Sequence, residues 1–197
     1  MKKLIILAAS LLLAFNASSQ TIEALAKKIN RPLPTTELMT ARAQLERLCT
    51  DTAANWLTLY YLAYADIELS FRMENTEQKL LYIKEAQDCL LKINGGDVSE
   101  VETLRGYAYF ALMAINPAEN GPRYAQDILA CLGKALQINP DNPRAVVINA
   151  IFKNNMYKSM GSRYKEFETD MNRCRKLFDG QDTTSVKPCW GSVYLEQ

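Results

Sequence analysis

Apolar residues recur at intervals of three and four along most of the chain, and this spacing predicts amphipathic helices. The first expected helix places four apolar residues on one face, namely Ile22, Leu25, Ala26 and Ile29. It ends in the run Arg31-Pro32-Leu33-Pro34, because proline cannot continue a helix. The same spacing predicts a second helix after a threonine cap at Thr35 or Thr36. Two short helices are therefore expected before the longer ones.

Six longer helices are expected after Ala53, each ending at a glycine, a proline or a change in spacing. Their ranges are 56–71, 77–93, 99–115, 124–138, 144–156 and 163–178. Residues 116–123 contain two prolines and a glycine, so the sequence predicts a loop there. The chain has only 8 glycines and little alternation of apolar and polar positions, which argues against strands. The pattern as a whole predicts an all-α fold.

The stretch ALQINPDNPRA, residues 135–145, ends one helix and begins the next within a few positions. Pro140 cannot continue the preceding helix and disfavours helical geometry in the residue before it. Asp141 or Asn142 is expected to cap the next helix, and Pro143 suits its first turn, where no backbone donor is needed. A connection this short makes the two helices antiparallel neighbours, as in helical-hairpin repeats.

Three segments of the chain can be superposed as repeats of one hairpin. Small or aromatic residues mark the middle of the first helices, with spacings of 46 and 44, at Tyr60, Gly106 and Ala150. The corresponding positions in the second helices, with spacings of 45 and 39, are Leu90, Ala135 and Cys174. Small residues at such positions let paired helices approach closely. The prediction is an all-α domain of antiparallel helical hairpins, stacked as a short right-handed superhelix of the tetratricopeptide-repeat (TPR) type.

The middle segment fits the TPR pattern best, with Gly106 and Tyr109 in its first helix and Ala135 and Pro140 in its second. The chain also resembles a family of small exported TPR-like proteins of Gram-negative bacteria. Four stretches carry the resemblance: the helix from Trp56 to Tyr64 after a polar cap, INPAENGPRY, ALQINPDNPRA, and PCWG at residues 188–191. The resemblance implies a helical-repeat fold and export, and it implies no activity.

The chain departs from this family pattern after Phe152. Relatives tend to have a glycine-rich loop there, whereas this chain has only Met160-Gly161-Ser162. We therefore expect the third repeat to be the least regular one.

The first residues have the pattern of a cleavable signal peptide. Lys2 and Lys3 precede an apolar run from Leu4 to Phe15, and Ala17-Ser18-Ser19 supplies small residues for cleavage. The run is about 12 residues long, which is short for a membrane span. Cleavage after Ser19 is expected, with an uncleaved anchor helix as the alternative. No cysteine is placed there for lipid attachment, so a periplasmic or secreted protein without stable membrane insertion is expected.

Cleavage would divide the chain into a signal peptide (1–19), a helical-repeat domain (20–179) and an irregular tail (180–197). The tail is expected to pack on the last hairpin through Trp190. The mature chain has 21 basic and 22 acidic residues and no basic run, so nucleic acid is not an expected partner. Histidine is absent, which excludes Ser-His-Asp and Cys-His catalysis and histidine-containing zinc sites.

The first helix of each hairpin usually lines the concave face of such a repeat domain. Carrying this over by position gives six candidate binding residues: Tyr61, Tyr64, Tyr107, Phe110, Asn154 and Asn155. Aromatic rings in a groove can hold an extended peptide or a partner helix. The alternative is that these rings pack between the helices. The predicted loop 116–124 likewise has two interpretations, a functional loop or a structural insert that packs Tyr124 against its hairpin.

Five cysteines suggest a disulfide in an exported protein, and Cys174 and Cys189 are the candidate pair. Cys89 and Cys131 lie within predicted helices, where cysteine is commonly a buried thiol. No CxxC motif occurs, so neither a metal site nor thioredoxin-type chemistry is expected.

The sequence favours a non-catalytic scaffold that binds a protein or a peptide and uses no cofactor or metal. A structural subunit of an envelope assembly is the first alternative, and it would present a larger and flatter apolar surface. An enzyme with a reactive cysteine is the second. It would need a positive group other than histidine to activate the thiolate.

Overall fold

The computed structural model describes residues 22–51 and 55–196, so the predicted signal peptide lies outside the described residues. A helical stretch at residues 22–29 precedes seven α-helices and a 3-10 helix. These are α2 (Thr35–Asp51), α3 (Trp56–Arg72), α4 (Thr76–Lys92), α5 (Val98–Ile115), α6 (Pro117–Ile138), α7 (Pro143–Ser159), α8 (Phe167–Asp179) and η1 (Ser192–Glu196). No strand occurs in these ranges, which confirms the all-α class. None of the described helices has both the length and the apolar character that crossing a bilayer requires.

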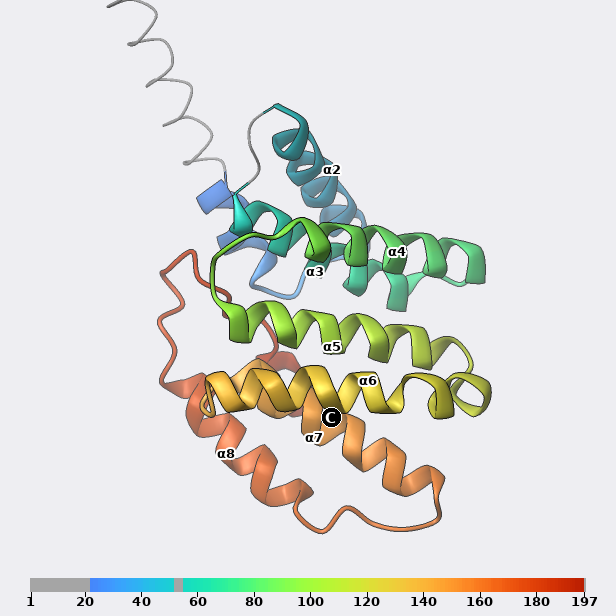
Figure 1. Cartoon of the computed structure of the whole chain (residues 1–197). Coiled ribbons are helices and arrows are strands. Elements are labelled where there is room, and N and C mark those ends of the chain that lie inside the picture. Colours follow the sequence, from blue (N-terminus) through green and yellow to red (C-terminus); the bar gives the residue numbers. More distant parts are fainter. Residues whose placement is uncertain (1–21, 52–54, 197) are drawn as a thin grey trace, which may run out of the picture.

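Consecutive helices pair as hairpins: α3 with α4, α5 with α6, and α7 with α8. The first helices of the hairpins also contact one another in order, α3 with α5 and α5 with α7, so they form one continuous layer (Figure 1). Helix α2 packs on α3 at the N-terminal end of the stack. The expected stack of helical hairpins is confirmed, and it includes the third hairpin.

Four of the helices begin at a polar side chain that caps their first turn. Asn55, Asn75, Asp97 and Asn142 each accept a hydrogen bond from a backbone N–H two or three residues later, at 2.9–3.1 Å. Each such cap stabilises its helix by about 1 kcal/mol. The caps explain why helices restart so soon after each turn.

The junction between α6 and α7 is tied to the start of α5. The Asn142 side chain caps α7 through its oxygen, and its Nδ2 donates to the Ser99 hydroxyl at 3.0 Å. The Ser99 hydroxyl in turn donates to the carbonyl oxygen of Ala135 in the last turn of α6, also at 3.0 Å. All three residues are buried. The cap of α7 therefore also fixes α7 relative to the hairpin of α5 and α6.

Gly106 lies where α5 crosses α6. A Cβ atom added there would lie 2.8 Å from Cγ of Leu132, closer than side chains normally approach. Both helices are thus held at a distance that only glycine allows at this position. This agrees with the role that the repeat pattern predicts for the middle of the first helix.

The prediction of a loop at residues 116–123 is wrong. Helix α6 begins at Pro117, and Asn116 alone separates it from α5. Pro117 stands at the first helical position, where a missing N–H costs nothing. Tyr124 stacks on Tyr109 with ring centroids 6.0 Å apart. Tyr124 therefore packs against its hairpin, as the structural interpretation expects, but from a helix and not from a loop.

Candidate functional site

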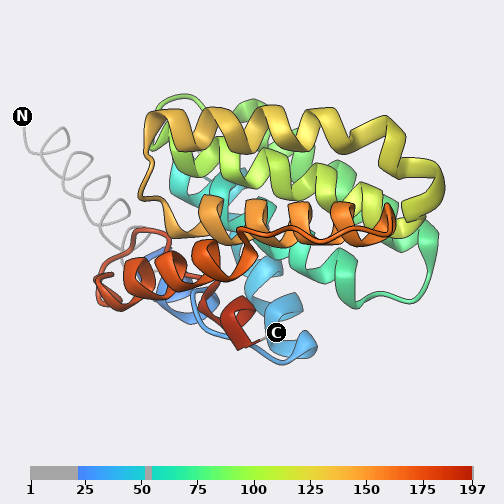
Figure 2. The ribbon, with the colours of Figure 1, turned by 90° about the horizontal axis from the view of Figure 1, so that it is seen from below.

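The C-terminal tail crosses from the last hairpin to the N-terminal end of the chain. Gly191 passes beside α8, since a Cβ atom there would lie 3.2 Å from the ring of Phe178. Asn30 then holds the tail at two points: its Nδ2 donates to the carbonyl of Lys187 at 3.2 Å, and its Oδ1 accepts the N–H of Cys189 at 3.1 Å. Figure 2 shows the tail beside the N-terminal helical residues. The tail therefore contacts the N-terminal residues as well as the last hairpin, on which the sequence places it.

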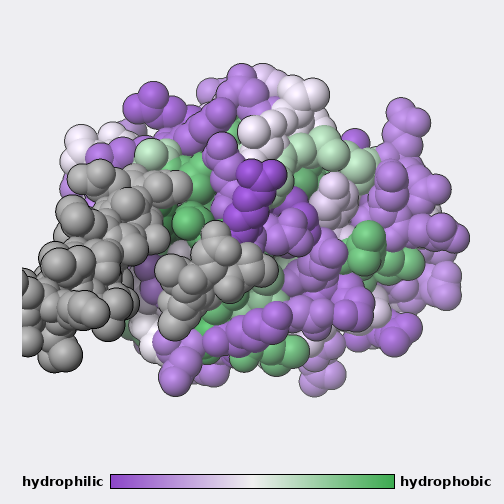
Figure 3. Space-filling view, turned by 90° about the horizontal axis from the view of Figure 1, so that it is seen from above, coloured by the Kyte–Doolittle hydropathy of each residue, from purple (hydrophilic) through white to green (hydrophobic). Residues whose placement is uncertain are grey.

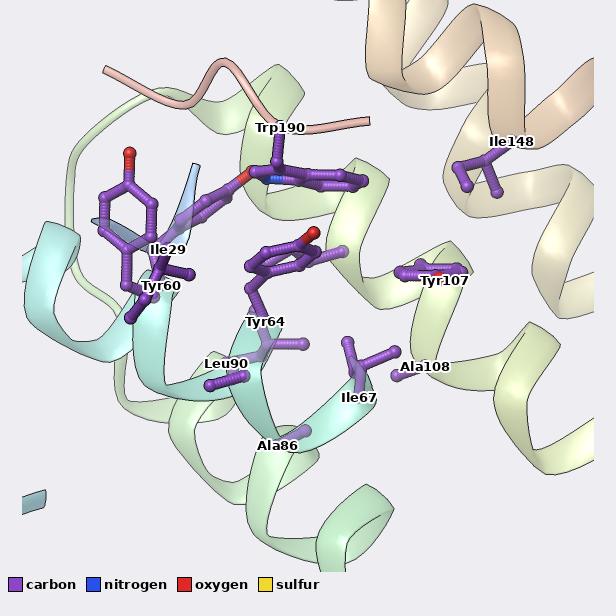
Figure 4. Close-up of a cluster of buried hydrophobic side chains, with 14 of the residues drawn as sticks. Ile29, Tyr60, Tyr64, Ile67, Ala86, Leu90, Tyr107, Ala108, Ile148 and Trp190 are labelled. Atoms are coloured by element: carbon purple, nitrogen blue, oxygen red, sulfur yellow. The ribbon is translucent and has the colours of Figure 1, made fainter. Parts of the chain in front are cut away.

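Trp190 is the anchor of this tail, and it is almost completely buried. Its indole stacks on Tyr64 of α3, with ring centroids 4.3 Å apart and planes inclined by 19°. It lies nearly parallel to Tyr107 of α5 as well, at 5.9 Å and 18°. Figure 4 shows the indole over the ring of Tyr64. The tail thus covers the face that α3 and α5 share.

A buried chain of polar groups runs beneath the indole. The indole N–H donates to the Tyr60 hydroxyl at 2.9 Å, and this hydroxyl donates to Glu100 at 2.8 Å. Arg144 closes the chain with hydrogen bonds from its Nε and one terminal nitrogen to the Glu100 carboxylate, the shortest at 2.7 Å. Because every member of this chain is buried and bonded, it connects α3, α5 and α7 with the tail.

Three of the predicted binding residues are not available on an open concave face. Tyr61, Tyr64 and Tyr107 are buried, and the Tyr61 hydroxyl donates to the carbonyl of Val186 in the tail at 2.9 Å. The prediction of an open aromatic groove at these rings is wrong, because the tail fills it. The alternative that the rings pack inside the protein is correct for them.

The other predicted residues remain partly or fully accessible. Phe110 is half-buried, Asn154 is half-buried and Asn155 is exposed. Neither amide side chain takes part in a described hydrogen bond, whereas the Phe110 ring lies 5.9 Å from Phe152 and 6.5 Å from Tyr107. The structure therefore brings Phe110, but not the two asparagines, into one aromatic cluster with the predicted tyrosines.

Phe71 was missed by the sequence analysis, and it extends the cluster to the surface. Its ring lies 5.4 Å from Tyr107 and 6.5 Å from Phe110, and the residue is 41% exposed. A sequence signal for it exists, because Phe71 follows Tyr64 by seven positions, which places both on one face of α3. We call the five rings Tyr64, Trp190, Tyr107, Phe71 and Phe110 the aromatic strip. The strip is buried at Trp190 and open at Phe71.

Glu68 lies between the strip and the end of the tail. Its carboxylate accepts hydrogen bonds from the hydroxyls of Tyr107 at 2.9 Å and Tyr194 at 2.5 Å, and Arg72 pairs with it at 3.1 Å. Burial raises the pKa of Tyr107 and Tyr194 well above the usual range, and the negative charge of Glu68 adds to the shift. These phenols therefore stay neutral at physiological pH.

The predicted disulfide between Cys174 and Cys189 is absent, since both residues are free thiols. Cys174 is buried between α7 and α8 and donates to the carbonyl of Pro143 at 3.2 Å, while the backbone N–H of Cys189 is held by Asn30. Burial raises the pKa of the Cys174 thiol to about 12 and also raises that of Cys189. Neither thiol has the depressed pKa of a reactive cysteine.

The remaining thiols show the same behaviour. Burial raises the pKa of Cys89 to about 12, that of Cys131 to about 11, and that of Cys49 above its usual value. Thiolates are the nucleophilic form of cysteine, so none of the five is activated in this structure.

No family model and no curated protein matches this chain. Among solved structures, the chain is similar to the HusA haemophore from Porphyromonas gingivalis. The two share a TM-score of 0.64 and 23% sequence identity, and the match covers 91% of this chain and 88% of that one. Because the identity is low, the similarity concerns the fold.

Proposed function

We propose that this protein is an exported, non-catalytic binding protein that holds a flat, conjugated ring compound on the open end of the aromatic strip. The observation that carries the proposal is the exposed ring of Phe71, which continues a run of aromatic side chains at the surface. Flat rings bind aromatic side chains by offset stacking and by removal of apolar surface from water. A water-exposed phenylalanine beside Phe110 offers both.

Haem is the particular ligand to test. It is a flat conjugated ring, and the structurally similar HusA is a haemophore. Phe71 and Phe110 have ring centroids 6.5 Å apart and planes inclined by 71°, so such a ring would stack on one of them and meet the edge of the other. The fit is to the ring system, since the chain has no histidine to coordinate iron.

Binding in this proposal depends on stacking and not on coordination of the metal. The tyrosines closest to the open end, Tyr107 and Tyr194, are buried phenols bonded to Glu68. Their pKa values are raised, so they do not supply the phenolate that would bind iron. Protoporphyrin IX without iron should therefore bind as well as haemin.

The test is a titration of the mature protein with haemin, followed by the change in Soret absorbance, and a parallel titration with protoporphyrin IX, followed by fluorescence. Both should bind with similar affinity. Phe71→Ala should lower the affinity for both ligands at least tenfold, because burial and stacking of one aromatic ring contribute about 1.5–3 kcal/mol to binding. Since Phe71 is already exposed, this variant should fold as the wild type does.

The matched control is Leu91→Ala, which removes another exposed apolar side chain, on α4 and outside the strip. It should leave both affinities unchanged. If Phe71→Ala and Leu91→Ala bound haemin and protoporphyrin IX with equal affinity, the ligand would not lie on Phe71. Haemin binding without protoporphyrin IX binding would show that iron is coordinated and would contradict the stacking mechanism.

Peptide binding is the second candidate function, and the tail itself favours it. Residues 186–190 already lie on the helical layer as a peptide segment with a tryptophan anchor, bonded through the backbone to Asn30 and Tyr61. A partner segment with an aromatic anchor would compete for the same place. This is the peptide-recognition mode in which side-chain pockets give specificity and backbone hydrogen bonds add affinity.

A peptide of residues 186–196 added to the full-length Trp190→Ala variant tests this second candidate. The variant should bind the labelled peptide, measured by fluorescence anisotropy, because its own tail lacks the anchor. The wild type should bind it at least tenfold more weakly, and a scrambled peptide should bind neither. Failure of the variant to bind would exclude the tail site as a peptide groove and would leave the ring-binding proposal unaffected.

A further inference from the structure

A second hollow, distinct from the aromatic strip, opens between α2, α3 and α4. Its volume is about 450 Å³. Leu59 and Leu62 of α3 form its apolar wall, and the thiols of Cys49 and Cys89 face it from α2 and α4. A volume of this size accommodates a small organic molecule. The rest of the lining consists of charged side chains.

Arg42 of α2 is the centre of this charged lining. Its guanidinium donates to Asp66 at 2.7 Å, to Glu46 at 2.8 Å and to Glu85 at 2.5 Å, one carboxylate from each of the three helices. One positive charge thus faces three negative ones. Glu46 and Glu85 are partly exposed to water, so the cost of uncompensated charge falls mainly on the buried Asp66, unless another cation or a proton compensates for it.

Asp66 is the member of this group that lacks full compensation. Its side chain is completely buried, and its Oδ1 receives the hydrogen bond from Arg42. Its Oδ2 has no hydrogen-bond partner in the described part of the chain and almost no surface exposed to solvent, so a ligand would reach it only when the carboxylate turns toward the hollow. A buried carboxylate oxygen without a donor is rare in folded proteins and requires an explanation.

The charges around Asp66 leave an excess of one negative charge in the hollow. Arg42 offsets one of the three carboxylates, and Lys92, which also lines the hollow, offsets a second. Asp88 also lines it, but pairs with Lys84 at 2.6 Å. The thiols of Cys49 and Cys89 are neutral at physiological pH, because burial raises the pKa of both. One additional positive charge would balance the site.

We infer that this hollow is a binding site for a small organic cation, whose ammonium group donates to Asp66 Oδ2 while its apolar part lies against Leu59 and Leu62. The hydrogen bond satisfies the orphaned oxygen, and the single positive charge balances the lining. The leucines favour a cation with an apolar body over a bare metal ion. Burial raises the pKa of Asp66 to about 7, against the opposing effect of Arg42, so a proton competes with the cation below neutral pH.

The probe is 2-phenylethylamine, which has one ammonium group and an apolar ring, and the matched neutral compound is 2-phenylethanol. Binding to the mature protein is measured by isothermal titration calorimetry at pH 8 and at pH 6. The amine should bind at pH 8 and at least fivefold more weakly at pH 6, where Asp66 is mostly protonated. The alcohol should bind at least tenfold more weakly than the amine at pH 8.

Asp66→Asn should lower the affinity for the amine at least tenfold at pH 8. Asparagine keeps an acceptor for Arg42 and puts an N–H₂ group where the ammonium would donate, so the fold is retained. Glu77→Gln is the matched control, since it removes one negative charge from an exposed position in the first turn of α4, outside the lining of the hollow, and its affinity should fall less than threefold.

Several results would overturn the inference. Equal binding of the amine and the alcohol would remove the role of the charge. Unchanged affinity in Asp66→Asn would place the amine elsewhere. No binding of the amine would mean that a proton or a water molecule alone satisfies Oδ2. Binding of zinc chloride in place of the amine would assign the site to a metal ion.

Discussion

The indole N–H of Trp190 donates to the hydroxyl of Tyr60 at 2.9 Å, although 130 positions separate the two residues in the chain. This bond joins the C-terminal tail to α3, the first helix of the first hairpin. In a stack of hairpins each unit contacts mainly its neighbours, so a contact between the two ends is uncommon. Here the tail supplies it, and the buried polar chain from Tyr60 through Glu100 to Arg144 makes it cooperative.

Breaking the buried ion pair between Arg144 and Glu100 should be strongly destabilising. Arg144→Met leaves the Glu100 carboxylate buried with the Tyr60 hydroxyl as its remaining donor. The expected loss is about 3–5 kcal/mol in the free energy of unfolding, because an unpaired buried charge remains. Urea denaturation followed by circular dichroism measures it.

The double variant Glu100→Leu with Arg144→Met removes both charges and should recover most of this loss. Arg173→Met breaks an exposed pair with Asp141 and should change stability by less than about 1 kcal/mol. If the double variant were no more stable than Arg144→Met, the burial of an unpaired charge would not be the cause.

Gly95 and Gly96 allow the cost of one close contact to be separated from the cost of backbone strain. Both have positive φ, 81° and 80°, so alanine at either position costs about 1 kcal/mol. A Cβ at Gly95 meets open space, whereas one at Gly96 would lie 2.2 Å from the Trp56 ring. Gly96→Ala should therefore cost a further 1–3 kcal/mol. Equal melting temperatures for the two variants would show that Trp56 moves away freely.

Helix limits could be predicted where a polar cap and a regular apolar spacing coincide. Asn55, Asp97 and Asn142 all cap helices close to the expected positions. The start of α6 could not be predicted, because residues 117–123 are mostly exposed and carry no apolar period. Pro122 was interpreted as a helix breaker, yet it lies in the second turn, where it removes a single backbone hydrogen bond.

The candidate site was only partly predictable for a similar reason. The tyrosines of α3 and α5 were correctly placed on one shared face, since their position follows from helical spacing. What covers that face depends on where Trp190 lies, and the tail has no periodicity from which its path could be read. Phe71 carried a usable signal, its seven-residue spacing from Tyr64, because this spacing keeps both rings on one face of α3.

All five cysteines should be alkylated without prior reduction. Iodoacetamide added to the protein in guanidinium chloride should raise the mass by five adducts, because the structure has five free thiols. In the native protein at pH 7 the reaction should be slow, since burial raises the pKa of every thiol. Three adducts under denaturing conditions would reveal one disulfide. A single fast adduct in the native state would support a reactive cysteine and revive the enzyme hypothesis.

Asp66 should make stability fall as the pH rises from 4 to 8. Its pKa is about 7 in the folded protein, raised mainly by burial, and about 4 in the unfolded chain. Between these values the folded state holds a proton that the unfolded state has lost, so raising the pH favours unfolding. At about 1.4 kcal/mol per pKa unit, the contribution lost is on the order of 4 kcal/mol and is complete above pH 7.

Other carboxylates contribute in the opposite sense, so the informative quantity is the difference between the wild type and Asp66→Asn. Urea denaturation at pH 4.5 and pH 8 should show that difference changing by several kcal/mol, with the asparagine variant relatively more stable at pH 8. Glu46→Gln should reproduce the pH dependence of the wild type, because this exposed partner of Arg42 leaves Asp66 buried and ionisable. A difference that did not depend on pH would mean that Asp66 is ionised throughout, held by Arg42 alone. The imbalance of charge around Arg42 would then be tolerated without a proton.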